Sequence, residues 1–409
     1  MAGRALPEAV FARALAFLRE LTGISSPSGD REGLLRAAQL LAEALAARGL
    51  IPEIAEESTG SRPATHLPVL VARGRDVSRG HLLLLGHLDT VLPALAPRIE
   101  GERLVATGAI DMKGGLAALV GALDLLAERG RRPADDLLLV AVPDEEVGGE
   151  LSRRAVRRWG EGARALWVLE PGEPAEGGAE TLVTGRRGMF TWHLAARGRS
   201  SHSGLAYWQG RSALNAAARW STAAEALSAR NGGPTISCAR LVAGDAAFVE
   251  SLASEADLLA SDRRLNVVPD RAAVEGEARF LRPAEGEALA RRLAGLAAET
   301  AAATGTEIDF HADPQIPPVD PDGPHRALAE HLIELAARQG WRLTLDRERG
   351  GISFPNFLPD PGRIPVLDGL GPVGGGMHTR DEYVDLESFR RRIVLLADLL
   401  QADAPPIHH

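Results

Sequence analysis

Several residue types are scarce in this 409-residue chain, and each scarcity excludes something. Cys238 is the only cysteine, so no disulfide bond can form within the chain and a zinc site built from cysteine thiolates is excluded. A chain with so little cysteine suits a reducing compartment, and we expect a cytoplasmic protein. Aromatic residues make up only 4% of the sequence, whereas alanine and leucine are abundant, which favours many helices.

Long apolar runs and an excess of positive charge are also missing. No stretch reaches the roughly 18 apolar residues that a membrane-spanning helix needs, and the N-terminal segment lacks the apolar core of a signal peptide. The formal net charge is −9, which argues against nucleic acid or an acidic membrane as a partner. We therefore expect neither partner, and the length favours two domains with separate cores.

Polar residues that could bind metal follow three short apolar runs. Residues 82–85 lead into Gly86-His87-Leu88-Asp89, residues 137–142 lead into Asp144-Glu145-Glu146, and residues 166–169 lead into Glu170. Continuous apolar runs of this length are typical of buried parallel strands. Because ligands bind beyond the carboxyl ends of such strands, the polar residues are expected to meet at one edge of a sheet.

Two further segments complete this set. Asp111 opens the run Asp-Met-Lys-Gly-Gly, and His378 follows a glycine-rich run far downstream. Imidazole and carboxylate are the usual ligands of catalytic zinc, so the set predicts a pair of divalent metal ions. Taken alone, an acidic triplet is most often a solvated turn and His87 could be an ordinary strand-end histidine. Their conjunction favours the metal site. Lys113 is the single lysine among 46 basic residues, which indicates that an arginine is not acceptable at this crowded position.

The pattern of the chain changes near residue 184. From about 65 to 183, strand-like runs alternate with helical segments, which indicates an α/β domain with a parallel sheet. Residues 189–311 instead predict the order β-α-β-β-α-β of a ferredoxin-like domain. We therefore expect a discontinuous catalytic domain formed by 1–183 and 317–409, interrupted by an inserted α+β domain at 184–316.

The motifs together resemble a family of co-catalytic dizinc exopeptidases and deacylases. This family includes glutamate carboxypeptidase, acetylornithine deacetylase and succinyl-diaminopimelate desuccinylase. The resemblance rests on Gly-His-Leu-Asp-Thr-Val, Asp-Met-Lys-Gly-Gly, Asp-Glu-Glu and Leu-Glu-Pro, and it covers nearly the whole chain. It implies a zinc-exopeptidase-like catalytic domain with a mixed, mainly parallel sheet, and it makes the inserted domain a lid that dimerises.

The resemblance assigns roles within the metal centre. Asp111 would bridge the ions, His87 and Glu170 would complete one ligand set, and Glu146 and His378 would complete the other. Glu145 would be the general base toward a metal-bound hydroxide, and Asp89 would orient the imidazole of His87. A cis peptide bond after Asp111 is also implied. Zinc is the expected metal, although cobalt or manganese accepts the same ligands.

The inserted domain would supply contacts to the substrate. By resemblance, His202 would cross a homodimer interface and stabilise the oxyanion in the partner's active site. Asn266, Arg279, Gly350 and Gly351 match positions that hold the substrate carboxylate. Without the resemblance, His202 would be read as a surface-loop histidine and Arg279 as a solvated strand residue.

The resemblance implies hydrolysis of an amide or peptide bond next to a free carboxylate, in a small peptide or an N-acyl amino acid, because Glu170 stands where carboxypeptidases and deacylases of the family carry glutamate. The alternatives are an N-acyl-amino-acid deacylase and a non-catalytic metal-binding protein on the same scaffold. A dinucleotide-dependent enzyme is disfavoured because no Gly-x-Gly-x-x-Gly turn follows the first strand. The chain departs from the family pattern in two places. Phe354 replaces an aspartate, and a more apolar pocket is one possible outcome. Residues 246–264 look like a helical insertion.

Overall fold

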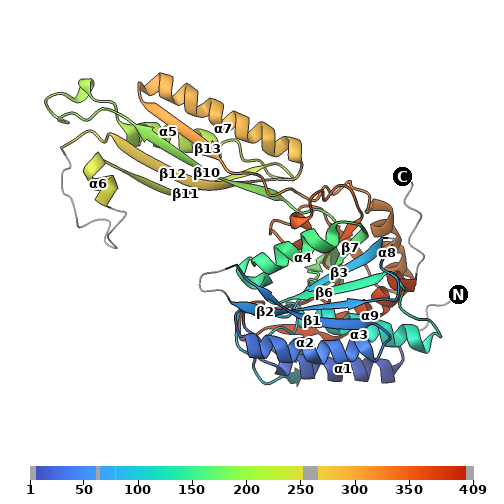
Figure 1. Cartoon of the computed structure of the whole chain (residues 1–409). Coiled ribbons are helices and arrows are strands. Elements are labelled where there is room, and N and C mark those ends of the chain that lie inside the picture. Colours follow the sequence, from blue (N-terminus) through green and yellow to red (C-terminus); the bar gives the residue numbers. More distant parts are fainter. Residues whose placement is uncertain (1–5, 61–64, 79, 252–265, 402–409) are drawn as a thin grey trace. The chain divides into compact units, whose positions relative to one another are not determined.

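The computed structural model describes residues 6–60, 65–78, 80–251 and 266–401, which form two compact units (Figure 1). The first unit comprises the chain up to Arg186, Val319–Arg349 and the chain from Ser353 onward. The second unit comprises Arg187–Pro318 together with Gly350–Ile352. The chain therefore leaves the first unit after Arg186 and returns to it at Val319.

A mixed sheet in the order β1-β2-β6-β3-β7-β15 forms the centre of the first unit. Strands β3, β6, β7 and β15 are mutually parallel, whereas β2 pairs antiparallel with β6, and the edge strand β1 pairs antiparallel with β2. Every residue of β3 and β6 is buried, which is why these runs are apolar without alternation. The strand bounds are β1 Ile51–Ser58, β2 His66–Arg73, β3 His81–His87, β6 Leu137–Val142, β7 Ala163–Val168 and β15 Val366–Leu367.

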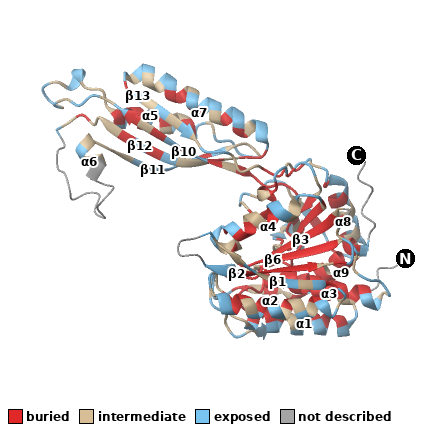
Figure 2. Cartoon of the chain, in the orientation of Figure 1, coloured by how far each residue is buried: buried red, intermediate tan, exposed pale blue. Residues whose placement is uncertain are grey.

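Helices cover both faces of this sheet (Figure 1). Helices α1 and α2 lie below it in that view and α4 lies above it, and α3 packs against both α1 and α9. Figure 2 shows buried residues along the sheet and exposed residues on the outer faces of α1 and α2. The helix bounds are α1 Glu8–Gly23, α2 Arg31–Ala46, α3 Lys113–Glu128, α4 Glu150–Gly160, α8 Arg326–Arg338 and α9 Leu386–Gln401.

Two small sheets lie beside the central one. The order β14-β9-β8 joins Leu343–Asp346, Ala179–Val183 and Pro174–Ala175. The order β16-β17-β5-β4 joins Gly374–Gly375, Tyr383–Asp385, Arg103–Val105 and Arg98–Glu100. Because β17 pairs with β5, the segment around residue 378 lies beside the segment that precedes residue 111.

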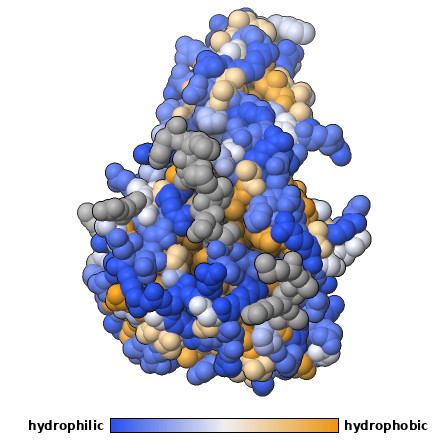
Figure 3. All heavy atoms as spheres, turned by 90° about the vertical axis from the view of Figure 1, so that its right-hand side faces the viewer, coloured by the Kyte–Doolittle hydropathy of each residue, from blue (hydrophilic) through white to orange (hydrophobic). Residues whose placement is uncertain are grey.

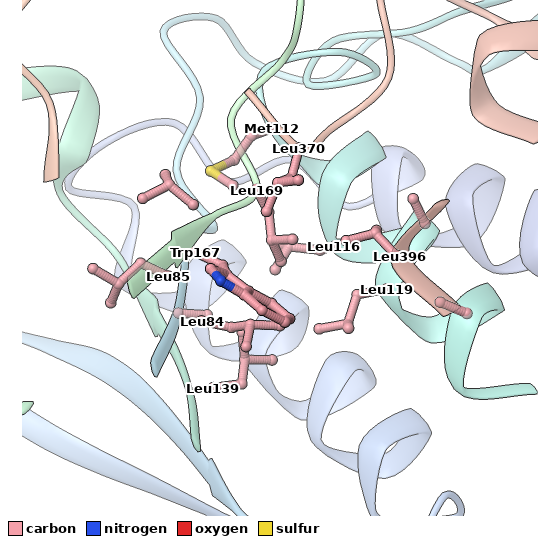
Figure 4. Close-up of a cluster of buried hydrophobic side chains, with 14 of the residues drawn as sticks. Leu84, Leu85, Met112, Leu116, Leu119, Leu139, Trp167, Leu169, Leu370 and Leu396 are labelled. Carbon is pink, nitrogen blue, oxygen red and sulfur yellow. The ribbon is translucent and has the colours of Figure 1, made fainter. Parts of the chain in front are cut away.

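The hydrophobic core reaches the ends of the parallel strands (Figure 4). Met112 and Leu169 are fully buried and belong to the same core cluster as Trp167, with Met112 at the edge of the cluster beside Leu169 and Leu370 in Figure 4. Met112 follows Asp111 and Leu169 precedes Glu170 in the sequence. Packing of these two apolar side chains thus fixes the backbone at both neighbouring carboxylates.

The second unit is an antiparallel sheet in the order β11-β12-β10-β13 with helices α5 and α7 packed against it (Figure 1). Its β-α-β-β-α-β order is the ferredoxin-like order predicted from the sequence. Trp192 and Trp220 meet edge to face in its core, with ring centroids 4.9 Å apart. The bounds are β10 Gly188–Arg197, α5 Ala213–Glu225, β11 Thr235–Gly244, α6 Ala246–Ser251, β12 Arg271–Phe280, α7 Pro283–Thr304 and β13 Glu307–Ala312.

Two departures noted in the sequence can be located. The segment predicted as a helical insertion begins with α6, and its remainder to residue 264 lies outside the described residues. Phe354 is fully buried and belongs to the main core of the first unit, so its ring lines the interior of that unit and not a pocket surface.

The surface and the helices give no sign of a membrane span within the described chain. No helix there combines the length and the apolar character needed to cross a bilayer. On the face shown in Figure 3, hydrophilic residues predominate and hydrophobic residues form separate patches.

Candidate metal centre

The carboxyl ends of three parallel strands deliver the acidic and histidine residues of the first unit. His87 is the last residue of β3, and Glu145 and Glu146 lie in the short 3-10 helix Glu145–Val147 after β6. Glu170 follows β7 by two residues. Asp111 comes from the turn before α3, where the Asp111–Met112 peptide bond is cis as expected.

Asp111 lies between the two histidines. One carboxylate oxygen is 3.0 Å from Nε2 of His87, and the other is 3.3 Å from Nε2 of His378. Nε2 of His87 is also 3.7 Å from Glu170, and Nε2 of His378 is 3.1 Å from Glu146. Each oxygen of Asp111 therefore faces a different histidine, and a different glutamate stands beside each.

The ring of His87 is held in one orientation. Its Nδ1 lies 3.0 Å from the backbone carbonyl oxygen of Asp89, to which it donates a hydrogen bond. With Nδ1 held by this carbonyl, Nε2 is the nitrogen that faces Asp111 at 3.0 Å, and it is the one that would bind a metal ion after losing its proton.

The carboxylate of Asp89 holds the acidic 3-10 helix. It accepts hydrogen bonds from the backbone N–H groups of Glu145 and Glu146, each at 3.1 Å, and from the hydroxyl of Ser28 at 2.7 Å. The nearer of its oxygens is 3.4 Å from Nδ1 of His87. Asp89 is fully buried, and it contacts both the imidazole of His87 and the backbone of the glutamate pair.

The crowding of carboxylates shifts their protonation. Burial raises the pKa of Glu146 to about 8 and that of Glu170 well above its usual range, and the charge of Asp111 adds to both shifts. Burial also raises the pKa of Glu145. The hydrogen bond to Asp111 raises the pKa of His378 to about 9. Burial alone would lower the pKa of His87, but hydrogen bonds to Asp111 and Asp89 outweigh it and raise that pKa well above 6.5.

This donor set fits two divalent cations. Two groups bring their ligand atoms within 4.8 Å of one another: His87, Asp111 and Glu146, and His87, Glu145 and Glu170. Oxygen and imidazole nitrogen are ligands that zinc, cobalt and manganese accept. Like charges this close are costly without cations, and bound cations would offset that cost.

Glu382 was missed by the sequence analysis although it lies at this centre. It lines a cleft together with Asp111, Glu146 and His378, and the other lining residues are Thr90, Val91, Leu92 and Thr107. Its only signal in the sequence is its place four residues after His378, in a charged run that reads as a solvated turn.

Lys113 is the other buried charge in this region. Its side chain is 1% exposed, and its Nζ donates to the backbone carbonyl of Ile24 at 2.7 Å. The aliphatic part lies against Gly108, where an added Cβ would come within 3.1 Å of the lysine Cδ. A compact ammonium at the end of a slender chain fits this space, whereas a planar guanidinium is bulkier.

The remaining predicted residues belong to the second unit. His202 and Asn266 are neighbours: the backbone N–H of Ser203 donates to the carbonyl of Asn266 at 2.8 Å. The guanidinium of Arg279 donates to the carbonyl of Gly350 at 2.5 Å and pairs with Glu277 at 2.8 Å. Glu277 thus occupies part of the donor fork that was expected to face a substrate carboxylate. The backbones of Gly350 and Gly351 are exposed.

The sequence is similar to those of known peptidases and related hydrolases. A model of peptidase family M20/M25/M40 matches residues 83–402. Carboxypeptidase G2 of Pseudomonas sp. (strain RS-16) is 26% identical over 391 residues, covering 94% of this chain and 87% of the relative. Succinyl-diaminopimelate desuccinylase of Granulibacter bethesdensis is 30% identical over 319 residues, covering 74% of this chain and 78% of the relative.

Solved structures share the fold. Aminopeptidase PepT of Bacillus cereus superposes with a TM-score of 0.73 at 22% identity, covering 96% of this chain and 99% of that chain. A dinuclear metal-binding peptidase from Bacillus subtilis superposes with a TM-score of 0.64 at 18% identity, covering 96% of this chain and 98% of that chain.

Proposed function

The chain belongs to peptidase family M20/M25/M40, and on that premise we propose that it hydrolyses an amide or peptide bond next to a free carboxylate with the help of two divalent metal ions. The observation that carries the proposal is the position of Asp111, whose two carboxylate oxygens each face one histidine. A carboxylate in this position can bridge two ions. The flanking carboxylates of Glu170 and Glu146 supply one further ligand on each side.

The residues of the first unit divide into two ligand sets. His87 and Glu170 would hold one ion and Glu146 and His378 the other, with Asp111 shared. Zinc is the metal we expect, and cobalt or manganese would fit the same donors. When bound, such ions supply Lewis acidity, which lowers the pKa of a coordinated water and polarises a carbonyl oxygen.

Glu145 is proposed as the general base. No hydrogen bond or ion pair among the described residues engages its carboxylate, and the backbone N–H of the same residue is fixed by Asp89 at 3.1 Å. Burial raises its pKa above the ordinary glutamate value. A base with a pKa nearer the working pH takes a proton from water and later returns it to the leaving amine more effectively.

His202 has the protonation pattern of an oxyanion donor. Its Nδ1 accepts hydrogen bonds from the backbone N–H groups of Gly204 and Leu205, at 3.1 and 3.2 Å. A neutral ring that accepts at Nδ1 carries its proton on Nε2. That N–H is then available to donate to developing negative charge, which is the chemistry proposed for it.

We propose that this contact is made across a homodimer. Leu205, on the loop that follows His202, is 86% exposed, and Trp208, in the short 3-10 helix Tyr207–Gln209, is 87% exposed. Large apolar side chains exposed together in this way mark interaction surfaces. Size-exclusion chromatography with light scattering tests the dimer, and Trp208→Ser is expected to weaken it.

A substrate panel tests the reaction. Dipeptides and N-acyl amino acids ending in glutamate, aspartate, alanine and leucine would be incubated with the protein and Zn²⁺ or Co²⁺, with EDTA as the control. Cleavage that EDTA abolishes is expected. Similarity to a protein named carboxypeptidase G2 supports the carboxypeptidase as the first candidate. Similarity to a protein named succinyl-diaminopimelate desuccinylase keeps an N-acyl deacylase as the second candidate.

The panel separates the candidates by the side of the amide that is recognised. Faster cleavage of dipeptides supports the carboxypeptidase, and faster cleavage of N-acyl amino acids supports the deacylase. A protein that binds two metal ions and cleaves none of these substrates would contradict both, and would favour a metal-binding protein without catalysis.

A further inference from the structure

Glu382 lies at the edge of the metal centre, and within the described part of the chain its carboxylate accepts hydrogen bonds from backbone N–H groups only. Its Oε2 accepts the backbone N–H of Gly108 at 2.8 Å, and its Oε1 accepts those of Ile110 and Asp111 at 3.0 and 3.1 Å. The side chain is 4% exposed. Three donors from one turn thus converge on a single carboxylate, an arrangement that strengthens each hydrogen bond because the acceptor is charged.

The same turn is held from its other side. The backbone N–H of Lys113 donates to the carbonyl of Gly108 at 3.0 Å, and the lysine side chain packs on that glycine. Gly108 has φ of 75°, a conformation that favours glycine. The turn ends at Asp111, whose backbone N–H is one of the three donors to Glu382.

The contacts of Glu382 also exclude a ligand role for it. Both of its oxygens already accept hydrogen bonds from backbone N–H groups, and no histidine nitrogen is paired with them among the described residues. It differs in this respect from Glu146 and Glu170, whose carboxylates face the histidines.

We propose that Glu382 is a positioning residue for the metal centre: it fixes the turn 108–111 so that Asp111 directs one oxygen to each histidine. The inference rests on the proposed function, since it assumes that Asp111 bridges two ions. Removing a group that orients a metal ligand typically weakens metal binding by about 10- to 100-fold.

The test is metal binding by Glu382→Gln. A glutamine can still accept from Ile110 and Asp111 through its amide oxygen, but its amide nitrogen then meets the N–H of Gly108 donor to donor. We expect the dissociation constant for Co²⁺, measured by chelator competition, to rise by about 10- to 100-fold, and the visible spectrum of the bound Co²⁺ to change.

The matched control is Glu387→Gln. Glu387 is 57% exposed and pairs with Arg391 at 3.4 Å, so this variant loses a nearby glutamate charge without touching the turn. Its Co²⁺ affinity and spectrum are expected to match those of the unmodified protein. If Glu382→Gln does not fold, Glu382→Asp replaces it, because the shorter aspartate keeps the charge but cannot reach all three N–H groups.

The outcomes separate this inference from the proposed function. An unmodified protein that binds no Co²⁺ overturns the proposed function. An unmodified protein that binds two ions per chain, together with a Glu382 variant of equal affinity and spectrum, overturns the inference alone. A purely structural role would lower the melting temperature of metal-free and metal-loaded protein alike and leave the Co²⁺ dissociation constant unchanged, which also overturns it.

Discussion

Metal affinity at the Glu146–His378 side of the centre is predicted to depend steeply on pH. His378 has a pKa raised to about 9, and its Nε2 lies between Asp111 and Glu146. A metal ion can bind this nitrogen only after its proton leaves, so binding releases a proton below that pKa. Raising the pH removes the competing proton, and affinity therefore increases with pH.

The magnitude follows from the position of the pKa. For the His378 proton alone, each pH unit below that pKa changes the apparent affinity about tenfold, so an increase from about pH 6.5 to about pH 8.5 gives up to about 100-fold. Loss of the proton from Glu146, whose pKa is about 8, adds to this change. An unperturbed histidine would give only about twofold over the same interval. The side chain of His378 is 52% exposed, and screening by solvent therefore keeps its contribution to the change in metal affinity below about 100-fold.

The assay is calorimetry of metal binding to metal-free protein at several pH values, in pairs of buffers with different heats of ionisation. The dependence of the measured heat on the buffer gives the number of protons released, and competition with a chelator of known pH dependence gives the affinity. A change of about twofold or less, with no proton released near neutral pH, would refute the reasoning.

Three further predictions concern single substitutions. Glu145→Gln should retain both metal ions and lose about 10²- to 10⁴-fold in turnover, and near-normal turnover would remove Glu145 as the base. Its control is Glu150→Gln, at the exposed start of α4, which should leave turnover unchanged. Asp89→Asn should weaken metal binding about 10- to 100-fold in chelator competition, because an amide N–H₂ would face backbone N–H donors, and unchanged binding would contradict this. Arg392→Met should lower the free energy of unfolding by about 3 kcal/mol in a urea titration, because the buried carboxylate of Glu180 loses its partner at 2.9 Å. An unchanged free energy of unfolding would show that this ion pair does not stabilise the protein.

The sequence predicts best those elements whose side chains are all buried. Strands β3 and β6 are apolar at every position because both faces are covered, and their ends are marked by the polar residues that follow. β1 escaped prediction because it is rich in glutamate and lies at the edge of the sheet, where exposed side chains hide any apolar pattern.

The candidate site shows the same division. His87 and Glu170 could be placed together because adjacent parallel strands end at one edge. Glu382 could not be assigned in this way, because its burial depends on the pairing of β17 with β5, a long-range contact that local patterns do not encode. A more apolar pocket was one outcome that the sequence left open for Phe354, but the side chain packs in the core, a position that only the folded chain reveals.

The interruption of the first unit has a consequence for synthesis of the protein. His87, Asp111, Glu146 and Glu170 leave the ribosome before the whole second unit, whereas His378 and the helix α9 that packs on α3 leave after it. The second unit can fold on emergence, but the first has to wait for its own C-terminal portion. A nascent chain thus carries four of the five proposed metal ligands without the fifth. The complete set of proposed ligands therefore exists only when translation has nearly finished.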